Sequence, residues 1–364
     1  GKPEPDIFTT ACDNLGVDYD LSVIVEDAVS GVQAGRKGNF GLVLGIAREN
    51  NARELLVNGA DLVMEDMAEL GGIGGIDRWF ETGLDEDCWS IVYHDYDPLK
   101  EKSREALLAV GNGYFGTRGA MEECNAGEHN YPGTYMAGMF NRRISKLGDR
   151  DIENEDFVNC PNWLSITFRV GEGDWMDPGR MKVLAIERRM SFRDGLLSRE
   201  ILVEDASGNR TRISSQRIAS MEDMHTAALR YTIEPENYSG KISIRSALVG
   251  DIINDGVERY RQLDQHHLEP VEQGGDRQSQ YLLVRTTQSD IEIAMAARLR
   301  VFVGRREQAA GFLHITFPGK VESEAEMDVK KGQSLTLEKL VKIYTSRETG
   351  PGLCLQMARE GISG

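Results

Sequence analysis

The sequence has few cysteines and no long apolar run. Its five cysteines lie far apart and form no CxxC pair: Cys12, Cys88, Cys124, Cys160 and Cys354. We therefore expect neither a disulfide framework nor a zinc site, and a reducing compartment is favoured. No apolar stretch approaches the ~20 residues that span a bilayer, and the first residues lack the basic and apolar regions of a signal peptide. These absences predict a cytoplasmic protein with no membrane partner.

Positive charge is also scarce. The 364 residues carry 42 Lys and Arg against 59 Asp and Glu, a formal net charge of −17. Such a chain repels phosphate backbones and anionic membranes, so nucleic acid is not an expected partner. A local site can still bind a small anion. The length predicts two domains, and the 40% hydrophobic content is ordinary for a globular protein.

Residues 1–70 alternate short apolar runs with helical patterns. We expect helices over 7–15, 28–37 and 52–58, with strands over 21–25, 40–46 and 60–64. The nearly continuous apolar run from Leu21 to Val25 predicts a parallel strand buried on both faces. This alternation predicts a partial α/β segment of Rossmann-like type.

The rest of the chain has a different character. Glycines at 71, 72, 74 and 75, followed by acidic residues, predict a linker over 71–87. Strand patterns dominate residues 88–347, as in the strict alternation from Trp163 to Val170, and predict a large antiparallel β-supersandwich. Residues 348–364 become helical, which predicts the start of a helical linker.

Two adjacent carboxylates follow the first buried strand. Glu26 and Asp27 stand where that strand ends, and ligands of open α/β sheets bind outside the carboxyl ends of strands. Mg²⁺ prefers such hard oxygen ligands and leaves room for a substrate phosphate. Lys2, on the loop before the first helix, could supply a positive charge to that phosphate. The alternative is structural, because acidic residues often end strands and Lys-Pro pairs are common in loops.

Two segments of this region resemble a known family. Residues 1–8 (GKPEPDIF) and 23–35 (VIVEDAVSGVQAG) are similar to the last two motifs of the haloacid-dehalogenase superfamily, in wording closest to its β-phosphoglucomutase branch. The resemblance implies that Lys2 contacts the phosphoryl group and that Glu26 and Asp27 hold Mg²⁺. It also implies a nucleophilic aspartate in a motif upstream of Lys2. We therefore expect residues 1–364 alone to lack phosphoryl-transfer activity.

Three later stretches combine glycine, amide and aromatic residues: 111–119, 131–140 and 159–163. Aromatic rings stack on sugar faces while amides bond hydroxyls, so Tyr135, Asn162 and Trp163 are candidate sugar-binding residues. The structural alternative is that the glycines serve tight turns and the aromatics pack between sheets.

Taken together, residues from about Cys88 to the C-terminus resemble the N-terminal domain of the maltose, trehalose and kojibiose phosphorylase family of glycoside hydrolases. The motifs are Trp89 with Tyr93, residues 111–119, residues 131–140 and residues 159–163, in that order. The resemblance implies a β-supersandwich, a helical linker and a catalytic α/α barrel after Gly364. Its chemistry would be phosphorolysis of an α-glucosyl disaccharide to β-glucose 1-phosphate, or hydrolysis of the same bond to glucose, with a general acid in the barrel and no cofactor.

The sequence thus favours a fragment of a bifunctional carbohydrate enzyme. Its partners would be sugars, sugar phosphates and inorganic phosphate, and the parent protein would be a homodimer. Two alternatives stay open: a carbohydrate-binding module without catalysis, and a stand-alone phosphatase of the dehalogenase type. The pair His266 and His267, without metal-ligand spacing, is expected on an exposed loop. Arg188, Arg189, Arg193 and Arg199 are expected on a solvated or ion-paired strand face.

Overall fold

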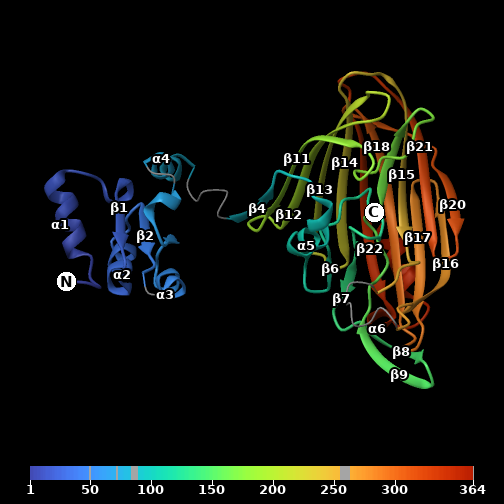
Figure 1. Ribbon diagram of the computed structural model, residues 1–364, viewed down its shortest axis with the longest axis horizontal. Coiled ribbons are helices and arrows are strands. Elements are labelled where there is room, and N and C mark those ends of the chain that lie inside the picture. The colour runs from blue at the N-terminus through green and yellow to red at the C-terminus, as the bar shows by residue number, and fades with distance from the viewer. Residues whose placement is uncertain (49–50, 71–72, 83–88, 255–262, 364) are drawn as a thin grey trace. The chain divides into compact units, whose positions relative to one another are not determined.

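The computed structural model describes residues 1–48, 51–70, 73–82, 89–254 and 263–363. The chain forms two compact units, Gly1–Trp89 and Ser90–Gly364 (Figure 1). Within the described ranges, no helix combines the length and the apolar character needed to cross a bilayer.

The first unit is built on a parallel sheet of three strands in the order β1-β2-β3. Its elements are α1 (Asp6–Leu15), β1 (Val23–Glu26), α2 (Val29–Lys37), β2 (Leu42–Ile46), α3 (Ala52–Val57), β3 (Leu62–Met64) and α4 (Ile73–Thr82), with short 3₁₀ helices at Tyr19–Leu21 and Met67–Leu70. The predicted alternation of strands and helices in residues 1–70 is confirmed.

The predicted burial of the first strand on both faces is wrong. Every residue of the central strand β2 is buried, whereas β1 lies at the sheet edge and Val25 is 47% exposed. One face of β1 packs Ile24 into a core with Val32. On the other face α4 covers Leu42 and Leu44 of β2, and Val25 stays uncovered.

The linker predicted over 71–87 is also wrong for the part that the structure describes. Residues 73–82 form α4, and Trp79 is buried against the sheet, where its Nε1 donates a hydrogen bond to Gly41 O at 2.7 Å. Burial of a large aromatic ring outweighs the helix-breaking tendency of the glycines at 74 and 75. Residues 71–72 and 83–88 lie outside the described part of the chain.

The second unit contains a ten-stranded antiparallel sheet. Its order is β16-β17-β18-β22-β14-β13-β12-β11-β4, and β19 pairs with β18. The bounds in that order are Leu268–Asp276, Ser279–Thr286, Glu292–Val303, Leu335–Thr345, Thr226–Pro235, Arg210–Ala219, Leu196–Glu204, Lys182–Ser191 and Ser90–Tyr93, with β19 at Arg306–Gln308.

A smaller antiparallel sheet packs on this large one. It has the order β10-β15-β21-β20, with bounds Ile166–Val170, Gly240–Val249, Lys320–Val329 and Leu313–Phe317. One continuous core joins the inner faces of both sheets, including Tyr231, Leu337, Ile244, Phe168 and Val321. Two stacked antiparallel sheets confirm the predicted sandwich.

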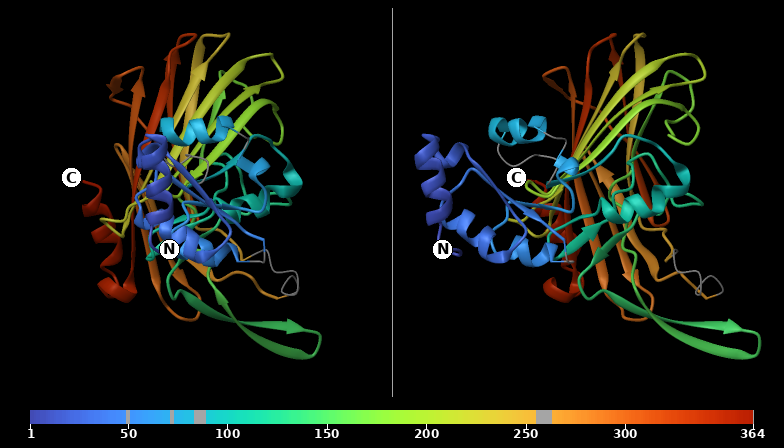
Figure 2. Two further views of the ribbon diagram at one scale, coloured as in Figure 1. Left: turned by 90° about the vertical axis from the view of Figure 1, so that its left-hand side faces the viewer. Right: turned by 60° about the vertical axis from the view of Figure 1, so that its left-hand side comes forward.

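Short elements surround the sandwich. β5 (Val110–Gly111), β6 (Phe115–Thr117) and β7 (Thr134–Met136) form a small sheet, and β8 (Phe140–Leu147) pairs with β9 (Arg150–Phe157) in a hairpin that projects from the body of this unit (Figure 2). The helices are α5 (Glu101–Leu107), α6 (Ser346–Thr349) and α7 (Cys354–Gly361), with a 3₁₀ turn at Pro98–Lys100. Helix α7 packs Cys354 and Ala358 on Ala294 and Ala296 of the large sheet.

Candidate functional site

Glu26 and Lys2 meet in the first unit. Glu26 is the last residue of β1, and its carboxylate forms an ion pair with Lys2 Nζ. The side chain of Glu26 is 12% exposed. A Cβ at Gly31 would lie 2.2 Å from Glu26 Oε2, so a larger residue at position 31 would displace this carboxylate. The structure therefore brings together Lys2 and Glu26, two of the predicted site residues, while their roles in phosphoryl contact and Mg²⁺ binding stay predictions.

Asp27 lies in a more open environment. Its side chain is 56% exposed, and Arg48 Nε is 3.8 Å from its Oδ2. Asn51 Nδ2 donates to the backbone oxygen of Asp27 at 3.2 Å, while Asn51 Oδ1 is buried without a hydrogen-bond partner. Glu26, Asp27 and Asn51 thus offer oxygen donors of the kind that Mg²⁺ prefers. No group of three or more His, Cys, Asp or Glu side chains placed to hold a metal occurs in the described ranges.

Tyr135 lines a cavity in the second unit. This cavity, of about 320 Å³, lies between β7, β9 and the residues around Asp264. The Tyr135 ring stacks on Phe157, with centroids 5.2 Å apart and planes at 26°, and its hydroxyl bonds to the Tyr131 hydroxyl at 3.3 Å. Tyr135 is the one predicted sugar-binding residue that the structure places at a cavity.

Trp163 and Asn162 are both buried and bond to other parts of the second unit. Trp163 is fully buried in the sandwich core, and its Nε1 donates to Thr117 Oγ1 at 2.9 Å. Asn162 is buried, accepts the Leu164 amide at 2.9 Å and bonds to Val249 through its backbone. The predicted sugar contacts of both residues are wrong, because their polar groups are used to connect loops to the sandwich.

A buried polar cluster beside the cavity was not predicted from the sequence. His266 is exposed as expected, but His267 is 1% exposed and its Nε2 lies 3.1 Å from Asp156 Oδ2. Burial lowers the pKa of His267 and favours the neutral ring. Asn141, also buried, lies 3.1 Å from His267 Nδ1 through its amide nitrogen. Only tertiary packing could reveal this cluster, because His267 is 126 residues away from Asn141, which pairs with Asp156 in the β8–β9 hairpin.

Arg188 and Arg199 are ion-paired rather than solvated, whereas Arg193 is exposed. Arg188 forms two hydrogen bonds to Glu101, at 2.7 and 2.9 Å, and both side chains are buried. Arg199 binds both oxygens of Glu123 at 2.7 Å. These pairs connect helix α5 and the segment between β6 and β7 to the large sheet, and they leave no unpaired charge for an external anion at Arg188 or Arg199.

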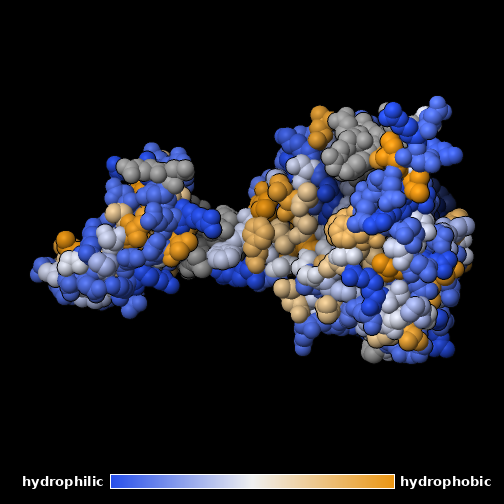
Figure 3. Space-filling model, turned by 90° about the horizontal axis from the view of Figure 1, so that it is seen from below, coloured by the Kyte–Doolittle hydropathy of each residue, from blue (hydrophilic) through white to orange (hydrophobic). Residues whose placement is uncertain are grey.

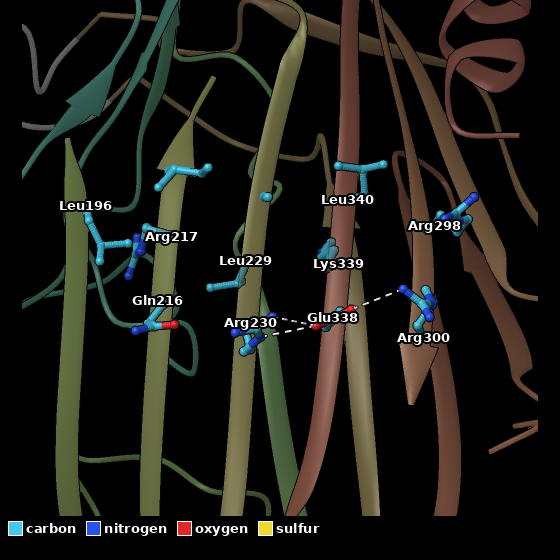
Figure 4. A pocket seen from close by; sticks show the side chains of 12 residues that line it. Leu196, Gln216, Arg217, Leu229, Arg230, Arg298, Arg300, Glu338, Lys339 and Leu340 are labelled. Atoms are coloured by element: carbon cyan, nitrogen blue, oxygen red, sulfur yellow. Dashed lines mark hydrogen bonds and ion pairs between the residues drawn. The ribbon is translucent and has the colours of Figure 1, made fainter. Parts of the chain in front are cut away.

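A groove of about 360 Å³ crosses the outer face of the large sheet (Figure 4). Its apolar lining includes Leu196, Ile218 and Leu340. Glu338 accepts from Arg230 at 2.9 Å and from Arg300 at 3.5 Å, so these charges are paired with one another. Figure 3 shows apolar surface as separate patches among hydrophilic residues. The groove is suited to packing against apolar atoms rather than to acid–base chemistry.

Comparison with known proteins places most of the chain in one family. Residues 91–363 match the model of the N-terminal domain of glycosyl hydrolase family 65. An uncharacterized glycosyl hydrolase of Mycobacterium tuberculosis is 38% identical over 263 residues, covering 72% of this chain and 20% of that protein. The kojibiose phosphorylase of Thermoanaerobacter brockii is 28% identical over 275 residues, covering 74% of this chain and 34% of that protein.

Two further proteins are similar to the same part of the chain. The trehalose 6-phosphate phosphorylase of Lactococcus lactis is 29% identical over 279 residues, covering 73% of this chain and 33% of the relative. A solved structure of a putative kojibiose phosphorylase from the human microbiome has the same fold, with a TM-score of 0.63 and 17% identity. The match covers 77% of this chain and 36% of that one. The chain therefore spans only a fifth to about a third of the length of these proteins. This chain belongs to glycosyl hydrolase family 65, and its residues 91–363 correspond to the domain that is N-terminal in that family.

Proposed function

We propose that the protein containing this chain cleaves an α-glucosyl disaccharide, such as maltose, trehalose or kojibiose, with inorganic phosphate and releases β-glucose 1-phosphate. The observation that carries the proposal is the family membership of residues 91–363. It is supported by relatives named as kojibiose, trehalose 6-phosphate and maltose phosphorylases. In such an inverting reaction phosphate replaces water as nucleophile, and a carboxylic acid protonates the leaving oxygen. Hydrolysis of the same substrates is the alternative.

We assign no catalytic residue to the sandwich. Three of the buried carboxylates, Glu101, Glu122 and Glu123, are held by arginines, so they are unavailable as general acids. We propose that the sandwich supports a catalytic domain and contributes to a homodimer. The apolar groove at Leu196, Ile218 and Leu340 supplies contact area for such packing, next to the sheet surface that α7 already covers.

We propose that the first unit belongs to a phosphosugar mutase of the dehalogenase type. Glu26 and Asp27 would hold Mg²⁺, with the Asn51 amide oxygen beside them, and Lys2 would contact the phosphoryl group. When bound, Mg²⁺ would neutralise charge on the transferred phosphoryl group. The ion pair with Glu26 holds the Lys2 ammonium at the strand end, where it can orient a phosphate. The two activities would together convert the disaccharide to glucose 6-phosphate.

The cysteines support a reducing, cytoplasmic location. Cys12, Cys124, Cys160 and Cys354 are buried free thiols. An oxidising compartment would favour disulfides in a protein with several cysteines.

Phosphorus NMR tests the phosphorolysis proposal. The protein encoded by the complete gene is incubated with maltose, trehalose or kojibiose and inorganic phosphate. We expect β-glucose 1-phosphate, and residues 1–364 alone should produce none. Release of glucose without phosphate consumption would establish hydrolysis instead. Turnover of p-nitrophenyl phosphate by residues 1–364 would favour the stand-alone phosphatase.

Calorimetric titration with Mg²⁺ tests the metal proposal separately from turnover. The variants Glu26→Gln and Asp27→Asn of residues 1–364 should each weaken Mg²⁺ binding at least tenfold, because each removes an anionic ligand. Asp20→Asn, an exposed acid in the 3₁₀ helix Tyr19–Leu21 before β1, is the matched control and should leave the affinity unchanged. Equal affinities in all four proteins would refute the assignment.

A further inference from the structure

The cavity beside Tyr135 has the composition of a binding site, and no known function is assigned to it. Six of its lining residues are Tyr131, Tyr135, Asn154, Asp156, Phe157 and Asp264. Its volume of about 320 Å³ is at the lower end of the ~300–1,000 Å³ typical of small-molecule pockets. The occupant is therefore small, of the size of one or two sugar rings.

One wall of the cavity is aromatic. Tyr135 stacks on Phe157, and Phe157 in turn contacts Phe140, with ring centroids 5.2 Å apart in both pairs. Phe157 is 41% exposed and Phe140 48% exposed. A phenyl ring left at the surface beside polar groups costs free energy unless an apolar face covers it. The C–H face of a pyranose ring offers such a face.

The facing groups are mainly hydrogen-bond acceptors. Asn154 donates its Nδ2 to Asp156, which leaves Asn154 Oδ1 buried without a partner. His267 Nδ1 accepts from the Asn141 amide nitrogen, which places the ring proton on Nε2, 3.1 Å from Asp156 Oδ2 but outside hydrogen-bond geometry. The hydrogen bond from Asn154 fixes the orientation of Asp156. The Asp156 side chain is 16% exposed, so its carboxylate can accept a hydroxyl proton from a ligand in the cavity.

The charges argue against an anionic ligand. Glu155, Asp156 and Asp264 line the cavity, and Asp264 is already paired with Arg143. Burial alone would raise the Asp264 pKa, but hydrogen bonds from His266 and Arg143 hold it below its ordinary value, so this carboxyl is ionised at neutral pH. A sugar phosphate would be repelled, whereas a neutral sugar would not.

We propose that this cavity binds one ring of a neutral carbohydrate. The sugar face lies against the exposed part of Phe157, beside Tyr135, and its hydroxyls donate to Asp156. The cavity would hold the sugar without reacting with it. This inference rests on the geometry of the second unit and does not depend on the phosphorolysis proposed above.

Titration of residues 1–364 by calorimetry and saturation-transfer NMR tests the proposal, without phosphate present. The probes are glucose, maltose, trehalose and kojibiose. We expect saturable binding of at least one of them. Phe157→Ala and Asn154→Leu should each weaken it at least tenfold, and Tyr135→Phe should weaken it less, because this change keeps the ring. Phe192→Ala removes an exposed ring on the turn between β11 and β12 and should leave binding unchanged.

Circular dichroism first establishes that each variant is folded. If Phe157→Ala does not fold, Asn154→Leu and Tyr135→Phe carry the test. The proposal is overturned if none of the four sugars binds saturably, if binding survives in Asn154→Leu and the folded aromatic variants, or if Phe192→Ala weakens it equally. Tighter binding of glucose 6-phosphate than of glucose would also overturn it. Because no turnover is measured, failure here and failure of phosphorolysis are distinguishable.

Discussion

Lys339 illustrates how strongly single residues can depend on their surroundings in this protein. It lies on β22, is 1% exposed and points into the space between the two sheets. Its ammonium donates to the backbone oxygen of Ala247 on β15 at 2.8 Å. A buried ammonium without a carboxylate is unfavourable, so burial lowers the Lys339 pKa well below its ordinary value.

We predict that Lys339→Met stabilises residues 90–364 at pH 7 by at least about 1 kcal/mol, since it removes a buried charge and preserves volume. The folded state binds fewer protons at Lys339 than the unfolded state, so the wild-type protein gains stability as pH rises toward the unfolded pKa of about 10.4. The difference between variant and wild type should therefore shrink between pH 7 and 10.

Urea unfolding at several pH values measures this difference. Lys331→Met, at an exposed lysine on the turn before β22, is the control and should change stability by less than about 0.5 kcal/mol. A destabilised Lys339→Met protein, or a difference that grows with pH, would contradict the prediction.

At the scale of elements, alternating sequences predicted most strands of the sandwich, and the exceptions have physical causes. β21 (Lys320–Val329) alternates strictly, but small residues such as Ser323 and Ala325 occupy its inner face and weaken the apolar signal. β16 contains Pro270 and two glycines, which are typical of a loop. The sheet tolerates these residues because β16 is an edge strand with one neighbour.

Helix α4 should contribute strongly to the stability of the first unit. Trp79→Ala should destabilise the first unit by about 3–5 kcal/mol, because it removes a buried ring packed on β2 and a hydrogen bond to Gly41. Thermal unfolding measures the loss. Val57→Ala, at an exposed position in α3, should have little effect. Unchanged stability in Trp79→Ala would mean that residues 73–82 do act as a linker.

The whole molecule has separate cores in its two units. The first unit buries its apolar residues around β1, β2 and β3, and the second unit around the two stacked sheets. Each core is formed by residues of one unit, so each unit should unfold as its own cooperative transition.

Calorimetry of residues 1–364 should therefore show two transitions, and Trp79→Ala should lower only one of them. Residues 90–364 expressed alone should retain the other transition at the same temperature. A single transition shifted as a whole by Trp79→Ala would show that the two units unfold together.

The sequence alone determined what depends on local order along the chain: the parallel α/β segment, the antiparallel sandwich, Lys2 and Glu26 as candidates, and the family resemblance of residues 88–364 that the domain match then bore out. Periodicity and turn residues encode these features directly. Tertiary structure decided what depends on residues far apart in sequence. It buried Trp163 but left Tyr135 at a cavity, and it brought Asn141, Asp156 and His267 together. The reason is that burial and unsatisfied hydrogen bonds are properties of packed surroundings, which a linear pattern does not contain.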